Sequence, residues 1–131
     1  MSHRLTELRG TLLELHKTLV DSERVTYEQA FGPIHSPNQF LQLLTGDPWF
    51  AWLRPLSQLI VAMDEALDAK VPPASGEIEA LIKQTRLLLV ASEEGEGFSR
   101  HYFEALQRDP DVVLAHAGAA KHFNPRQRDL G

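Results

Sequence analysis

The feature that most constrains the fold is a run of regularly spaced leucines in the segment LTELRGTLLELHKTL near the N-terminus. Their spacing alternates between three and four residues, which matches the 3.6-residue turn of an α-helix and places the side chains along one seam. Leu13 and Val20 widen this seam into a face, which favours a helical bundle over a strict two-stranded coil. The pattern predicts a helix over about residues 4–27, whose seam consists of Leu5, Leu8, Leu12, Leu15 and Leu19.

The charged side chains of this segment fall mostly away from the leucine seam. A helix with one apolar face usually exposes its charged residues on the opposite face. We therefore expect a solvated face that contains Glu7, Arg9, Glu14, Lys17, Glu23 and Arg24.

Proline, glycine and capping residues divide the middle of the chain. Ser36 has the character of an N-cap, with Gln39 as its partner in a capping box, and predicts a short helix that ends at Gly46 in a positive-φ conformation. Asp47 and the proline after it begin another helix, whose apolar positions continue to about residue 70. Because Pro55 lies inside that pattern, we expect a kink between residues 51 and 55.

Three further segments complete the pattern. Ser75 is the predicted cap of a helix over about residues 75–90, and because Leu87 and Val90 lie off its apolar face, its second half should be buried on nearly all sides. The glycines of SEEGEG predict a loop, followed by helices over about residues 99–108 and 110–122. The last helix is rich in small residues, and Gly118 within it predicts close contact with a neighbouring helix.

These segments predict an all-α, single-domain helical bundle of about four longer helices plus one or two short ones, with the second long helix kinked at Pro55. The length of 131 residues is that of one domain, and a 43% hydrophobic content argues against disorder along the whole chain. We expect residues 1–131 to form this single domain, with a core over about 4–122 and a flexible tail over 123–131.

Composition removes several functional classes. The absence of cysteine excludes disulfides, thiolate zinc sites and a cysteine nucleophile. The net charge of −5 argues against binding to nucleic acid, which draws its affinity from Lys and Arg contacts to phosphate. The apolar runs are too short for a signal peptide or a bilayer span, so we expect a cytoplasmic protein without a membrane partner.

The segment TGDPWFAWLRPLSQLIV concentrates aromatic residues around Pro55. Helical spacing places Trp52 on the same face as the core residues that follow, whereas Phe50 points away from that face. Arg54 lies beside the expected kink, and Arg86 directly precedes the apolar run LLLV. In such places a guanidinium pairs with a carboxylate or binds an anionic ligand. These four residues are the candidates for ligand binding, with core packing and an internal salt bridge as the alternative interpretations.

The histidines allow a second kind of site. A metal ion held between helices could use His16, His101, Glu104 and His116, although the chain lacks the Glu-x-x-His pairs of ferritin-like sites. Histidines that are exposed or make a single hydrogen bond are the alternative interpretation. We find no nucleophile elbow, phosphate loop or dinucleotide motif, which disfavours an enzyme, and we expect no cofactor.

The stretches DPWFAWLRPLSQLIVAMDE and RHYFEALQRDPDVVLAHA resemble small, all-helical bacterial proteins of uncharacterised families. The resemblance implies a helical bundle from a bacterial cytosol and supplies no catalytic residues.

Two functions follow as expectations. The first is a non-catalytic protein-interaction module that self-associates, most simply as a homodimer, because the apolar faces are generous and no catalytic constellation is present. The alternative is a small-ligand or metal-binding bundle with its site near the kink at Pro55.

Overall fold

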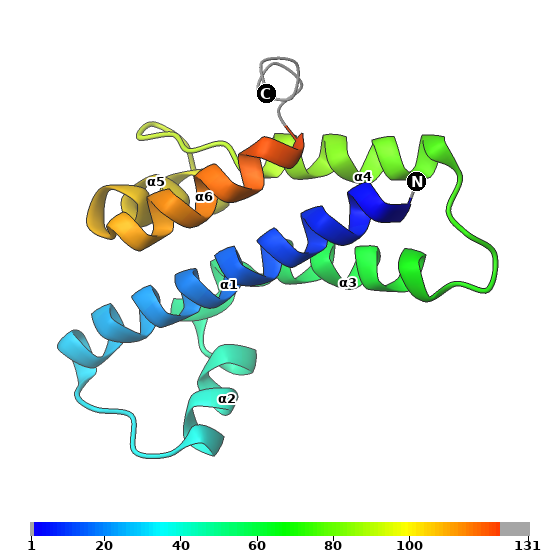
Figure 1. The fold of residues 1–131 in the computed structure, drawn as a ribbon. Helices are drawn as coiled ribbons and strands as arrows, with labels where there is room; N and C mark the ends of the chain where they lie inside the picture. The colour runs from blue at the N-terminus through cyan, green and yellow to red at the C-terminus, as the bar shows by residue number, and fades with distance from the viewer. Residues whose placement is uncertain (1, 124–131) are drawn as a thin grey trace.

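The computed structural model describes residues 2–123, and this part of the chain is an all-α bundle without strands (Figure 1). The predicted fold class is therefore confirmed. The elements in chain order are α1 (Ser2–Phe31), α2 (Pro37–Gly46), the 3₁₀-helix η1 (Pro48–Leu53), α3 (Arg54–Asp68), α4 (Ser75–Leu88), α5 (Phe98–Arg108) and α6 (Pro110–Phe123).

The long helix α1 lies at the centre and contacts α3, α4, α5, α6 and η1. The five leucines of the predicted seam are all fully buried. Leu13, however, is 41% exposed, because it lies about 100° around the helix from Leu12 and its side is not covered. The predicted tail began one residue too early, since Phe123 is a buried residue of α6; the rest of that tail lies outside the described residues.

Polar contacts join α1 to the helices that pack on it. Arg9 of α1 forms an ion pair with Asp64 of α3, and both α3 and α6 run antiparallel to α1 (Figure 1). At opposite ends of the α1–α6 pair, Glu7 lies 3.8 Å from His122, and Ser22 accepts a hydrogen bond from Arg108 of α5, just before α6 begins.

The predicted caps are mostly confirmed. The Ser36 hydroxyl accepts a hydrogen bond from the backbone N–H of Gln39 at 3.0 Å, and the Gln39 side chain accepts one from His35. Asp47 caps η1 through the backbone N–H of Trp49 at 2.8 Å.

Three predicted features of the helix ends are wrong. Helix α1 continues to Phe31, beyond its predicted end near residue 27. The N-cap of α4 is Ala74, and Ser75 is already helical. Gly46 ends α2 without a positive φ, since the chain leaves that helix through extended backbone at Asp47. Gly32, after α1, and Gly97, before α5, are the described residues that adopt positive φ.

The irregularity expected at Pro55 takes the form of a junction between two helices. Residues 48–53 form a 3₁₀-helix, and α3 begins at Arg54, so Pro55 occupies the second position of α3. In the first turn of a helix the missing N–H of proline has no partner to lose, which explains why this proline is tolerated.

The second half of α4 is not buried all round. Leu87 is 64% exposed, and Val90, which lies beyond the end of α4 at Leu88, is 51% exposed, whereas Ile78, Ile82 and Thr85 are buried. The reason is that α1, α3 and α6 contact one side of α4 and leave the other side open.

Candidate functional site

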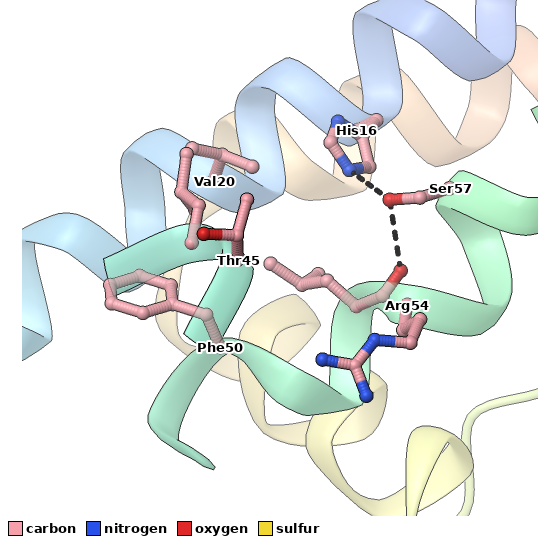
Figure 2. Close-up of a pocket in the computed structure, with 8 residues that line it drawn as sticks. His16, Val20, Thr45, Phe50, Arg54 and Ser57 are labelled. Atoms are coloured by element: carbon pink, nitrogen blue, oxygen red, sulfur yellow. Dashed lines mark hydrogen bonds between the residues drawn. The ribbon is translucent and has the colours of Figure 1, made fainter. Parts of the chain in front are cut away.

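A pocket with a volume of about 320 Å³ opens where α1, α2, η1 and α3 meet (Figure 2). It is built next to the junction at Pro55, close to where the sequence predicted a site. Its lining consists of His16, Val20, Leu44, Thr45, Phe50, Leu53, Arg54 and Ser57.

A polar pair forms one end of this pocket. His16 Nε2 lies 2.8 Å from Ser57 Oγ, and the Ser57 hydroxyl has a second, longer contact of 3.5 Å to the carbonyl oxygen of Leu53 (Figure 2). Burial lowers the pKa of His16, so its imidazole is neutral at pH 7 and forms the hydrogen bond as an uncharged group.

Arg54 gives the pocket its charge. It is an exposed residue at the rim, and its guanidinium makes no hydrogen bond or ion pair with any residue from 2 to 123. Because His16 is neutral and the other lining residues are uncharged, the pocket carries a single positive charge at neutral pH. An arginine without a protein partner beside a cavity is free to bind an anion.

The opposite end of the pocket is apolar. Val20, Phe50 and Leu53 are each less than 10% exposed, and Leu44 of α2 is half-buried. These side chains offer a surface for hydrocarbon but no hydrogen bonds. The pocket is therefore amphipathic, as small-ligand sites commonly are.

Two of the four predicted ligand-binding residues lie in this pocket, namely Phe50 and Arg54. Trp52 is in the core and does not line the pocket, and Arg86 donates a hydrogen bond to the carbonyl oxygen of Phe123 at 3.2 Å, where α4 meets the end of α6. The expectation that Phe50 points away from the core is wrong, since it is 2% exposed. With three residues per turn in η1, Phe50 and Leu53 lie directly above one another on one side of the helix, and both are buried.

The same three-residue period brings both tryptophans onto one buried carboxylate. Trp49 Nε1 and Trp52 Nε1 donate to the two oxygens of Glu23, at 3.1 and 2.8 Å, and Thr26 Oγ1 donates at 3.0 Å. The side chain of Arg108 lies 3.7 Å away as an ion-pair partner.

The assignment of Glu23 to the solvated face is wrong, because this residue is 6% exposed. The sequence did contain a signal for its burial. The next steps of three and four residues beyond Leu19 fall on Ser22 and Glu23, and both are buried. The seam therefore continues with polar residues that have partners in other elements.

The predicted metal ligands have other partners. His16 bonds Ser57, and His116 Nδ1 lies 2.5 Å from the hydroxyl of Tyr102. The ring of His101 stacks on Trp52, with Glu104 3.8 Å away. Within residues 2–123 no group of three or more His, Asp or Glu side chains could hold a metal ion.

The buried pair of His116 and Tyr102 is polar but uncharged. Burial lowers the pKa of His116 and raises the pKa of Tyr102, so the protonated hydroxyl donates to a neutral imidazole. Both residues are therefore explained by packing between α5 and α6.

A wider groove of about 600 Å³ runs between α1 and α6. A Cβ atom added to Gly10 or Gly118 would meet nothing within 4 Å, so the close neighbour predicted at Gly118 is missing from the described residues. The groove is lined by Glu7, Gly10, Thr11, Glu14, Ala115, Gly118 and His122.

Comparison of the chain with protein-family models, with curated proteins and with solved structures gave no match. Among the described residues no helix is long and apolar enough to cross a membrane. Functional inference therefore starts from the geometry of the pocket and the groove.

Proposed function

We propose that this chain is a small-ligand-binding helical protein whose site is the pocket at the η1–α3 junction. The observation that carries the proposal is the free guanidinium of Arg54 at the rim of a pocket with apolar walls. A volume of about 320 Å³ lies at the lower end of the range for ligand sites, roughly 300–1,000 Å³. The ligand should accordingly be small.

Binding is a better interpretation of the pocket than catalysis. The hydrogen bond between His16 and Ser57 has the composition of a base–nucleophile pair, and such pairs need a third group to orient the histidine. The pKa of His16 is shifted by burial alone, and no carboxylate among residues 2–123 contacts its ring. The pair therefore serves as a neutral polar end to the pocket.

A fragment titration tests this function. We expect a set of small neutral, anionic and cationic compounds, added to isotopically labelled protein, to shift NMR signals of the pocket residues in a saturable way. Thr45 is exposed on α2 and lines the pocket, so Thr45→Phe should fill the cavity and abolish these shifts.

Gln42→Phe is the matched control, because Gln42 is exposed on the same helix and does not line the pocket. This variant should bind as the wild type does. A fragment set that shifts no pocket signal, or shifts them equally in the Thr45→Phe variant, would contradict the proposal.

A self-associating interaction module is the second candidate, and the open groove between α1 and α6 favours it. Leu114 is 70% exposed and lies one helical turn from Gly118, whose side of the groove is empty. Around a two-fold axis, Leu114 of each copy could fill the hollow above Gly118 of the other, which is the self-complementary arrangement of a homodimer.

Sedimentation velocity across micromolar concentrations measures this association. Gly118→Leu should weaken the dimer by filling the hollow, and Leu114→Ala should weaken it by removing the side chain that enters. Leu87→Ala on α4 is the control, since Leu87 is similarly exposed but lies outside the groove. A wild-type monomer throughout that range would rule out this function.

A further inference from the structure

We propose that the pocket at the η1–α3 junction takes a small monoanionic amphiphile, namely a carboxylate attached to a short apolar chain. The inference rests on the proposed ligand-binding function and adds the chemical class of the ligand. The charge of the lining, its free hydrogen-bond donors and the size of the pocket support it.

The charge of the pocket suits one negative charge. Arg54 is the cationic residue of the lining, and none of the eight lining residues is acidic. The neutral imidazole of His16 adds no second positive charge at pH 7. A lone guanidinium neutralises a carboxylate completely, whereas a phosphate dianion would keep an unpaired charge in a pocket with apolar walls.

Hydrogen-bond donors are available for the carboxylate oxygens. Arg54 has five N–H donors, and none of them has a partner within residues 2–123. Ser57 lies three residues further along α3. The exposed Arg54 side chain is directed away from Ser57 in Figure 2, so it has to turn toward the pocket for both groups to contact one carboxylate.

The Ser57 hydroxyl can act as a second donor. In the tautomer of His16 that is protonated at Nε2, the ring donates to Ser57 Oγ. Within residues 2–123, the Ser57 hydroxyl can then donate only to the carbonyl oxygen of Leu53, which lies 3.5 Å away. A neutral O–H···O bond is normally about 2.7–2.8 Å long, so this contact is weak. A carboxylate oxygen in the pocket would be the better acceptor.

The size of the pocket limits the apolar chain. A volume of about 320 Å³ corresponds to about ten water molecules at roughly 30 Å³ each. An eight-carbon acid, with about ten non-hydrogen atoms, is of that size. Its chain would lie against Val20, Leu44 and Phe50 while its carboxylate pairs with Arg54.

Calorimetric titration of octanoate and octan-1-ol tests the ligand class, because the two compounds share a chain and differ in charge. Octanoate should bind with a Kd on the order of 1 mM or tighter, and octan-1-ol about tenfold more weakly. Arg54→Gln should lower the octanoate affinity about tenfold and leave that of the alcohol unchanged. Lys83→Gln removes the same charge from an exposed site on α4, outside the pocket, and should change neither.

The possible failures are distinguishable. Equal binding of acid and alcohol, unaffected by Arg54→Gln, would overturn the carboxylate inference and leave the ligand-binding function standing. Tighter binding of octyl phosphate as a dianion would overturn the monoanion assignment in the same way. If octanoate does not bind while neutral or cationic fragments occupy the pocket, the inference fails; if no fragment occupies it, the proposed function fails as well.

Discussion

At the scale of single residues, Glu23 is a buried carboxylate that contacts four other side chains. Its carboxylate joins three elements, because it accepts hydrogen bonds from both tryptophans of η1 and forms an ion pair with Arg108 of α5. Without this acceptor the two indole N–H groups would remain unpaired in a poorly solvated place, whereas Arg108 would keep its hydrogen bond to Ser22. An unpaired buried donor lowers the stability of the folded state by more than a formed hydrogen bond raises it, because the donor has lost its hydrogen bonds to water.

We expect Glu23→Ala to lower the free energy of unfolding by about 2–4 kcal/mol, because two indole donors lose their acceptor. Glu23→Gln should cost less, because its amide oxygen still accepts one indole N–H while its NH₂ group faces the other donor. Urea denaturation followed by circular dichroism measures both values.

Glu65→Ala is the control for this series, since Glu65 is exposed on α3, and it should change the stability by less than about 0.5 kcal/mol. A loss of less than about 1 kcal/mol for Glu23→Ala would mean that water replaces the carboxylate as the acceptor.

At the scale of elements, the junction between η1 and α3 determines the geometry of the pocket. A 3₁₀-helix turns every three residues, so η1 presents Trp49 and Trp52 to Glu23 while Phe50 and Leu53 face the pocket. A continuous α-helix would rotate these pairs apart by about 60° over three residues. The three-residue turn therefore aligns each pair more closely than an α-helix would, one pair toward the buried carboxylate and the other toward the pocket.

Replacement of Pro55 distinguishes a junction from a kink inside one helix. Proline lowers the conformational entropy of the unfolded chain, and in the first turn of α3 it does so without loss of a native hydrogen bond. Pro55→Ala removes this benefit and should therefore destabilise the protein by about 0.4–1 kcal/mol. Within a continuous helix the same change would stabilise by about 3 kcal/mol. The sign of the shift in Tm decides between them.

Pro110→Ala provides a matched comparison, because Pro110 is likewise in the first turn of a helix, after the aspartate cap of α6. Both alanine variants should shift Tm in the same direction and by similar amounts. A stabilising effect at Pro55 alone would contradict the junction.

At the scale of the whole molecule, packing around α1 places two histidines where their charged forms are disfavoured. Burial lowers the pKa of both His16 and His116 below the ordinary value of 6.5. The unfolded chain therefore binds protons below pH 6.5 that the native state does not bind, and the stability of the native state falls as the pH falls.

We expect the free energy of unfolding to be nearly constant between about pH 7 and 9 and to decrease between about pH 6.5 and 5.5, with a slope of at most about 1.4 kcal/mol per pH unit for each histidine. Urea titrations at several pH values measure this slope. His16→Gln should reduce it, whereas His35→Gln, at an exposed position before α2, should not. An unchanged slope in the His16 variant would show that other groups produce the pH dependence.

Local patterns by themselves determined the helical content and most of the boundaries. The leucine seam of α1 and the caps at Ser36 and Asp47 depend on contacts within a few residues, which the sequence records directly. The extent of burial was less predictable, because Leu13 and Leu87 are exposed by the positions of other helices rather than by their own spacing.

Only the tertiary structure decided the polar site and the pocket. Glu23 lies 26 and 29 residues from its tryptophan partners, and His16 lies 41 residues from Ser57. Arg54 could be anticipated near the pocket because it adjoins Pro55, whereas no local pattern distinguishes Ser57 or Thr45 as pocket residues. Whether such distant side chains meet depends on the type of each helix and on the angle at which the helices pack. A rotation of one helix about its own axis changes which of its residues face the core, and local spacing does not determine that rotation.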